Sequence, residues 1–192
     1  MAKLVGITGG IGSGKSVVGK VLSTMGYPIF YSDHEAKKLM QENQFIKNDL
    51  IDLFGADTYI DNELNRSFLA NQIFKNPSLK SKVNAIVHPR VRQHFKTWAK
   101  KQKSKLAFNE AAILFETGGY KEFDATLLVV ADKKIRIARV KARDKISTEQ
   151  VEERMKNQWS DEQKKLLTNH IVYNNDNDLI VPQILKILEQ LT

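Results

Sequence analysis

The chain has 192 residues, of which 42% are apolar, an ordinary content for a globular protein. It contains no cysteine, which excludes disulfides and thiolate metal sites, and no apolar run approaches the length of a membrane span. The net charge of +8 comes without zinc-finger spacing or an aromatic-basic RNA-binding pattern, so we expect a lysine-rich surface that handles small polyanions and not nucleic acid. With no signal-peptide pattern at the N-terminus, we expect a cytoplasmic protein.

The first elements form a strand, a glycine-rich turn and a helix. A strand is predicted at Lys3–Thr8 and a helix at Gly14–Met25, on either side of the sequence Gly-Gly-Ile-Gly-Ser-Gly-Lys-Ser. This is the context of a phosphate-binding loop, in which backbone N–H groups and the helix N-terminus face an anion. Lys15 is expected at the β- and γ-phosphates, and the Ser16 hydroxyl at Mg²⁺. The residues expected to bind the nucleotide here are Gly10, Ile11, Gly12, Ser13, Gly14, Lys15 and Ser16.

A short second strand is predicted at Ile29–Tyr31, and Asp33 follows it. Ligands of an open parallel sheet bind at the carboxyl ends of its strands, so Asp33 is expected at the same edge as the glycine-rich loop. The alternative is that Asp33 caps the helix that begins after it.

The next stretch, 35–103, is predicted to be a helical insertion that contains no strand. A polar, turn-rich segment, Asp57–Asn65, separates its helices, and a proline is expected to interrupt the last helix at His88-Pro89. The helical patterns cover Glu35–Met40, Phe45–Phe54, Ser67–Phe74 and Ser78–Lys103.

Three further strands are predicted at Lys105–Asn109, Leu127–Ala131 and Ile171–Tyr173, and an amphipathic helix at Ile180–Leu191. A basic helix carrying Arg136, Arg139 and Arg143 follows the middle strand. Two capping boxes, starting at Ser147 and Ser160, predict two short polar helices between 147 and 168. The alternation of strands and helices predicts an α/β protein with a doubly wound, parallel, five-stranded sheet and the P-loop NTPase fold.

Three parts are expected within this fold. The nucleotide-binding core would comprise 1–34, 104–140 and 168–192, the helical insertion 35–103 would bind substrate, and 141–167 would form a small lid.

The rest of the chain favours a small kinase among the phosphate-loop proteins. GTPases normally read guanine with Asn-Lys-x-Asp, which does not occur here. ATPase motors normally end an apolar strand in a magnesium-binding aspartate, and neither Asn109-Glu110 nor Val130-Ala131-Asp132 is persuasive in that role. A kinase needs a lid that excludes water, and the basic helix supplies arginines for the charge on the transferred phosphoryl group.

The motifs together resemble the dephospho-CoA kinase family, over nearly the whole chain. The resemblance rests on Thr8–Ser16, Asp33, Leu64–Leu69 with Ile73-Phe74, His88–Val91, Ile113–Glu116, Arg139 with Arg143, Arg154 with Gln158, and Asn174-Asn175. The chain departs from the family where a proline is Ala112, where a glutamine that often starts the basic helix is Arg136, and at Asp176, which replaces a glycine.

The resemblance implies a reaction in which ATP phosphorylates the ribose 3′-hydroxyl of 3′-dephospho-CoA to give ADP and coenzyme A. It implies ATP and Mg²⁺ as cofactors, no nucleic-acid or membrane partner, and a monomer or weak homo-oligomer. Lys15, Asp33 and Arg143 are the implied catalytic residues, with Asp33 as base or orienting carboxylate. The further nucleotide contacts implied are Arg139 and Asn175, and the substrate contacts are Asp33, Arg66, His88 and Glu116.

Each role has a plainer alternative. Arg143 could lie on a solvated helix face, and Arg66 could form a surface salt bridge. His88 could be a structural histidine before Pro89, and Glu116 could cap a turn. At the level of the whole protein, a different nucleoside or nucleotide kinase and a nucleic-acid-binding NTP switch stay open.

Overall fold

A computed structural model describes residues 2–76 and 78–192, which form two compact units. The first unit combines the chain up to Tyr31 with Ala99–Thr192, and the second is Ser32–Trp98. The assignment of 35–103 to substrate binding and of 141–167 to a lid stays a prediction.

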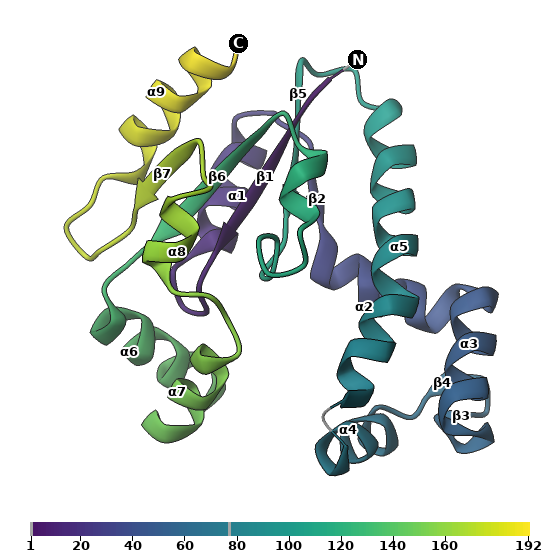
Figure 1. The fold of residues 1–192 in the computed structure, drawn as a ribbon. Helices are drawn as coiled ribbons and strands as arrows, with labels where there is room; N and C mark the ends of the chain where they lie inside the picture. The colour runs from purple at the N-terminus through teal and green to yellow at the C-terminus, as the bar shows by residue number, and fades with distance from the viewer. Residues whose placement is uncertain (1, 77) are drawn as a thin grey trace. The chain divides into compact units, whose positions relative to one another are not determined.

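The first unit is built on a parallel five-stranded sheet in the order β2-β5-β1-β6-β7, which confirms the predicted fold class (Figure 1). The strands are β1 (Lys3–Gly9), β2 (Ile29–Tyr31), β5 (Leu106–Glu110), β6 (Ala125–Val130) and β7 (His170–Tyr173). Its helices are α1 (Lys15–Thr24), α6 (Lys133–Asp144), α7 (Thr148–Lys156), α8 (Asp161–Lys165) and α9 (Ile180–Leu191).

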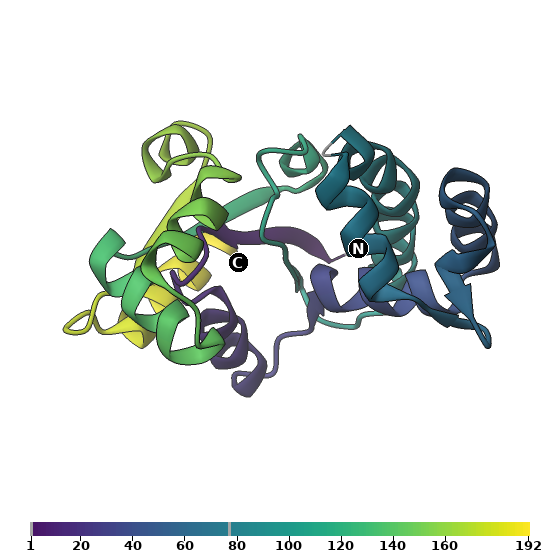
Figure 2. The same cartoon turned by 90° about the horizontal axis from the view of Figure 1, so that it is seen from below.

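The main core lies between this sheet and the helices α1 and α9, which Figure 2 shows on the same side of β1. Val5 and Ile7 of the central strand are fully buried against Val18 and Leu22 of α1 and Ile184 of α9. An unbroken apolar strand with both faces covered is what a parallel sheet requires. The sheet therefore holds the end of β1, where the glycine-rich loop begins, in a fixed place.

The two predicted capping boxes are confirmed. The Ser147 and Ser160 side chains each accept a hydrogen bond from the backbone N–H three residues on, and the Gln150 and Gln163 side chains accept from the backbone N–H of these serines. Each pair satisfies two backbone donors that a helix start leaves without partners. These caps explain why α7 and α8 form although they are short and polar.

The second unit contains α2 (Ser32–Glu42), α3 (Gln44–Phe54), α4 (Arg66–Lys75) and most of α5 (Ser78–Lys100). The prediction that this stretch holds no strand was wrong, because β3 (Tyr59–Ile60) and β4 (Glu63–Leu64) form a hairpin. Asp61 and Asn62, the two residues between them, both adopt positive φ, the conformation of the hairpin turn whose twist matches the strands. Glycine usually occupies such a turn, and its absence concealed the hairpin.

The predicted interruption at Pro89 was also wrong, since α5 continues through it. A proline removes one backbone donor and crowds the preceding turn, but burial of a continuous apolar stripe offsets that cost. The stripe consists of Val83, Val87, Val91 and Phe95, which are buried at four-residue spacing.

Candidate active site

The glycine-rich loop joins β1 to α1 and has the geometry of an anion-binding turn. Gly12 and Gly14 adopt φ values of 80° and 95°, which residues with a Cβ rarely tolerate. The Lys15 ammonium donates to the Gly9 carbonyl at 2.9 Å, which folds the side chain back over the loop. Ser16 lies in the first turn of α1 with an exposed side chain, so its hydroxyl is accessible from solvent.

Asn174, which follows β7, is bound to this loop. Its side-chain amide donates to the Ser13 carbonyl at 2.7 Å, and both residues are buried. A Cβ on Gly14 would collide with the same amide, so a side chain there would displace the Asn174 hydrogen bond. Sequence reasoning noted Asn174 only as part of a family motif and gave it no role.

Arg139 connects α6 to the turn after β7. Its guanidinium donates to the Asn174 carbonyl at 2.8 Å and pairs with Asp176 at 3.2 Å. The Asn175 side chain accepts from the Asp132 backbone N–H at 2.8 Å. The structure thus brings together Arg139 and Asn175, the two residues predicted to contact the nucleotide beyond the loop, at one end of the sheet.

Arg143 and Arg154 share one carboxylate. Asp144 accepts two hydrogen bonds from Arg143, at 2.7 and 3.1 Å, and one from Arg154 at 2.7 Å. The hydrogen bond from Arg143, with a second from Arg154, lowers the pKa of the Asp144 carboxyl below its ordinary value. Two guanidinium groups are therefore gathered at the point where α6 gives way to α7, half or more exposed.

Ile11, in the middle of the loop, is held on both sides by side chains distant in sequence. Arg136 donates from Nε to the Ile11 carbonyl at 3.0 Å, and Gln158 accepts from the Ile11 N–H at 2.8 Å. From the sequence, Arg136 was expected on the basic helix and departs from the family pattern, with no contact to the loop predicted. The prediction that Ile11 binds phosphate stays a prediction, and in this structure its N–H is already engaged.

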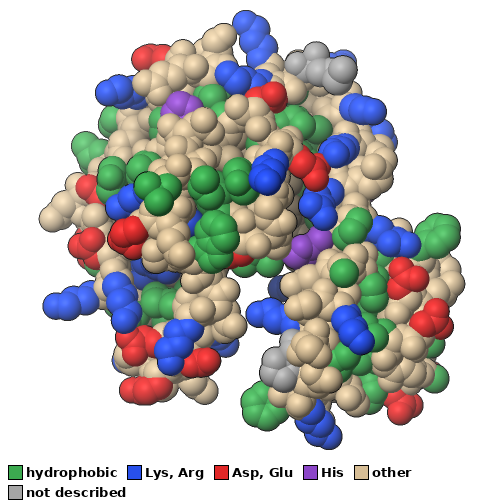
Figure 3. All heavy atoms as spheres, in the orientation of Figure 1, with side chains coloured by type: hydrophobic (Ala, Val, Ile, Leu, Met, Phe, Trp, Pro, Cys, Tyr) green, Lys and Arg blue, Asp and Glu red, His purple; other side chains and the backbone are tan. Residues whose placement is uncertain are grey.

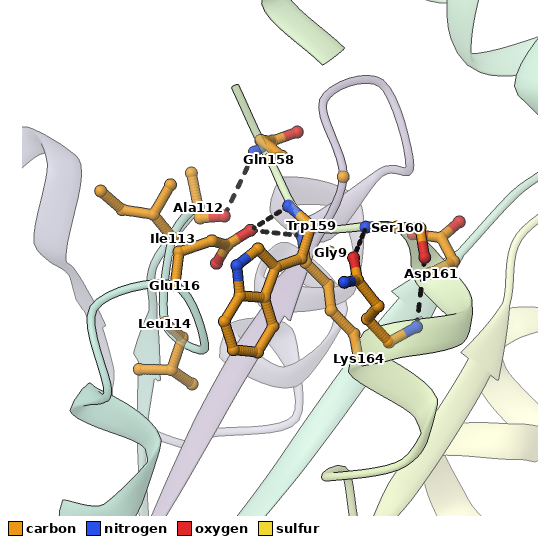
Figure 4. Close-up of polar contacts among 12 residues, drawn as sticks. Gly9, Ala112, Ile113, Leu114, Glu116, Gln158, Trp159, Ser160, Asp161 and Lys164 are labelled. Atoms are coloured by element: carbon orange, nitrogen blue, oxygen red, sulfur yellow. Dashed lines mark hydrogen bonds and ion pairs between the residues drawn. The ribbon is translucent and has the colours of Figure 1, made fainter. Parts of the chain in front are cut away.

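Glu116 lies after β5 and contacts the segment that precedes α8. Its Oε1 accepts from the Trp159 N–H at 3.0 Å and pairs with the Lys164 ammonium at 2.9 Å (Figure 4). Lys164 is completely buried, and Glu116 is 12% exposed. The predicted role of Glu116 in substrate binding stays a prediction.

The other candidate residues lie in the second unit. Asp33 is in the first turn of α2, which begins at Ser32, so its charge suits the positive end of that helix without acting as the cap. Burial lowers the pKa of His88, and Arg92 lowers it further, while the Asp33 carboxylate acts in the opposite direction. Asp33 and His88 therefore lie within electrostatic range of each other. Arg66 is the exposed first residue of α4.

Glu110, whose sequence context did not identify it as a magnesium ligand, is the last residue of β5, next to the central strand. Its Cα is paired with Ile7 of β1 on one side and with Tyr31 of β2 on the other. Burial raises the pKa of Tyr31, and the charge of Glu110 adds to that effect. Among residues 2–76 and 78–192, no group of three or more acidic, histidine or cysteine side chains could hold a metal ion.

Comparison with known proteins decides the family. The family model for dephospho-CoA kinase matches residues 3–179. The chain belongs to the dephospho-CoA kinase family. A dephospho-CoA kinase of Bacteroides fragilis is 39% identical over 189 residues, covering 98% of this chain and 92% of that protein. One from Salinibacter ruber is 43% identical over 181 residues, covering 91% of each chain. A crystal structure from Thermus thermophilus has a TM-score of 0.88 and 32% identity, and covers 100% of this chain and 98% of that one.

Membership in the dephospho-CoA kinase family confirms the predicted activity, and with it a place in coenzyme A biosynthesis and the use of ATP. In the part of the chain described, no helix has both the length and the apolar character needed to cross a lipid bilayer. On the face drawn in Figure 3, lysine and arginine side chains are scattered among acidic ones and form no single continuous patch.

Proposed function

We propose that this dephospho-CoA kinase transfers the γ-phosphoryl group of ATP with Lys15, Asp33 and Arg143 as its principal catalytic residues. The observation that carries the proposal is the loop itself: two glycines with positive φ lead into α1, with Lys15 folded over the Gly9 carbonyl. Such a loop offers backbone N–H groups and one cation to a polyphosphate.

In the proposed step, the oxygen of the ribose 3′-hydroxyl attacks the γ-phosphorus, and the bond to the bridging oxygen of ADP breaks. The hydroxyl proton passes to Asp33, whose exposed carboxylate is accessible to substrate. Lys15 neutralises charge on the β- and γ-phosphates, and Arg143 stabilises the charge that spreads over the phosphoryl oxygens in the transition state.

Mg²⁺ fits the donors that the first unit presents. Ser16 offers an exposed hydroxyl oxygen next to Lys15, and Glu110 offers a carboxylate at the same edge of the sheet for water ligands of the ion. When bound with ATP, the ion would supply positive charge that reduces the charge repulsion opposing transfer.

The remaining assignments follow the chemistry of the two substrates. Arg139 and Asn175 would contact ATP, with Asn175 at the adenine, and Arg66, His88 and Glu116 would contact dephospho-CoA. We further propose that 141–167 acts as a lid that excludes water, that the enzyme is a monomer or weak homo-oligomer, and that it is cytoplasmic.

The test is an ATP-consumption assay with dephospho-CoA, nucleosides and nucleoside monophosphates as acceptors, and with phosphorus NMR of the product. We expect turnover with dephospho-CoA alone and a new phosphate on the 3′-oxygen. Lys15→Ala should abolish transfer and weaken ATP binding, because the phosphates lose their cation. Near-normal turnover of purified Lys15→Ala, or faster turnover of a nucleoside, would refute the assignment.

A further inference from the structure

Two side chains from outside the glycine-rich loop hold both backbone polar groups of Ile11. Gln158 Oε1 accepts from the Ile11 N–H at 2.8 Å, and Arg136 Nε donates to the Ile11 carbonyl at 3.0 Å. The peptide unit is planar and trans, so its C=O and N–H point in opposite directions. Fixing the Ile11 carbonyl therefore also fixes the direction of the Gly12 N–H. Fixing the Ile11 N–H does the same for the Gly10 carbonyl, which accepts from the Ser13 N–H at 3.1 Å.

Gln158 makes a second contact that requires an amide side chain. Its Nε2 donates to the Ala112 carbonyl at 3.2 Å (Figure 4), while its Oε1 accepts from Ile11. An amide has both a donor and an acceptor, whereas a carboxylate only accepts and a thioether does neither strongly. Gln158 thus joins the loop after β1 to the segment after β5, the neighbouring strand.

The residues that follow Gln158 are fixed to that same segment by a buried ion pair. Glu116 Oε1 accepts from the Trp159 N–H at 3.0 Å and pairs with Lys164 at 2.9 Å, and the lysine side chain has no exposed surface. An unpaired charge would be very unfavourable in such a place, so the pair holds both residues together. Figure 4 shows Glu116, Trp159 and Lys164 converging beside Gln158.

The side of this attachment that faces α6 borders a hollow. The hollow has a volume of about 550 Å³, and its lining includes Arg136, Glu152, Trp159 and Asp161. Two ion pairs join α6 to the elements on the other side of this hollow. Arg136 pairs with Asp161 of α8 at 3.0 Å, and Lys133 pairs with Glu152 of α7. Directional polar contacts therefore contribute to the position of residues 158–164.

We propose that Gln158 is a positioning residue of the phosphate-binding loop, and that the Glu116–Lys164 ion pair holds it in place. Gln158 acts through Ile11 on the directions of the loop peptides, which set the fit of the loop to a polyphosphate. Residues 158–164 form the fixed base of the segment, and the moving part of the lid is confined to α7 and the turns beside it. This inference rests on the proposed use of the loop for ATP and is independent of the acceptor.

The experiment measures the dissociation constant of MgATP by calorimetry and the melting temperature, without an acceptor. We expect Gln158→Met to weaken MgATP binding about tenfold, the effect of losing one or two hydrogen bonds that order the loop. In a separate turnover assay, the KM for dephospho-CoA should change less than twofold. Gln41→Met is the matched control: the Gln41 amide also joins a backbone N–H to a carbonyl, those of Leu64 and Asn62, but in the second unit. It should leave MgATP binding unchanged.

A double-mutant cycle tests the part played by the ion pair. Lys164→Met should weaken MgATP binding, and adding it to Gln158→Met should weaken binding less than twofold further, because both act through Ile11. If Lys164→Met does not fold, Glu116→Gln, which keeps an acceptor for Trp159, takes its place in the cycle. Unchanged MgATP binding in Gln158→Met, an equal loss in Gln41→Met, or fully additive effects would overturn the proposal. Because no acceptor is present, failure of wild-type turnover on dephospho-CoA would refute the proposed function alone.

Discussion

Replacing Asn174 by alanine tests whether the loop depends on the turn after β7. The Asn174 amide donates to the Ser13 carbonyl at 2.7 Å, and Asn174 and Ser13 are 7% and 0% exposed. Alanine removes the donor and leaves that carbonyl buried without this partner, at a cost of about 1–3 kcal/mol. For a chain of this length, each kcal/mol shifts the melting temperature by roughly 2–4 °C, so we expect a fall of about 4–8 °C for a mid-range loss of about 2 kcal/mol.

Asn174→Ala should also weaken the binding of MgATP. The Ser13 carbonyl and the Gly14 N–H belong to one planar peptide, so the bond from Asn174 directs that N–H to the opposite side. Its loss should weaken MgATP binding about five- to tenfold, measured by calorimetry. Asn48→Ala removes an exposed side-chain hydrogen bond to Gln44 and should change the free energy of unfolding by less than about 0.5 kcal/mol. If Asn174→Ala melts like Asn48→Ala and binds MgATP normally, the peptide-direction argument is wrong.

Three further outcomes are expected. Asp33→Asn should keep the fold and MgATP affinity but lower kcat by about two to four orders of magnitude, whereas a loss of stability alone would indicate a purely structural carboxylate. Arg143→Ala should lower kcat by about 10²- to 10³-fold and change the MgATP dissociation constant far less, since the charge that Arg143 meets develops in the transition state. Hydrogen exchange in α7 should slow when both substrates bind. If exchange is the same with and without substrates and Arg143→Ala turns over normally, the lid assignment is refuted. Asp144→Asn should lower the melting temperature at neutral pH. Because arginine contacts depress the pKa of Asp144 in the folded state, its stabilisation is present above the ordinary carboxyl pKa and disappears as the pH falls through the depressed value. The melting curves of wild type and Asp144→Asn should therefore converge in acid, and a constant difference would count against the assigned pairing.

Much of the fold could be read from local patterns. The order of strands and helices, the capping boxes at Ser147 and Ser160 and the closing helix all depend on residues close in sequence. The hairpin at Asp61-Asn62 escaped because Asp and Asn adopt positive φ less readily than glycine and so mark a turn weakly. The continuity of α5 through Pro89 could not be judged from the proline itself, because the buried stripe that offsets its cost is a matter of tertiary packing.

The candidate site likewise contains residues that local sequence patterns identify and residues that they do not. The glycines, Lys15 and Ser16 are adjacent in the chain, and their spacing alone identified a phosphate-binding loop. The residues that hold the loop, Arg136, Gln158 and Asn174, lie 125, 147 and 161 residues from their partners in it. No periodicity or spacing connects positions so far apart, so these contacts had to come from the structure.

These contacts change how the glycine-rich motif itself should be understood. Glycines permit the loop to adopt the required conformation, but they also permit many others, since a residue without Cβ loses more entropy on ordering than any other. Side chains from three separate segments bind the loop by hydrogen bonds, one at the Ser13 carbonyl, one at the Ile11 carbonyl and one at the Ile11 N–H. These bonds supply the restraint that the glycines lack. Arg136 illustrates the point. Its side chain reaches the loop through Nε and still pairs with Asp161 through Nη1. The ion pair fixes the direction of the donor to the Ile11 carbonyl.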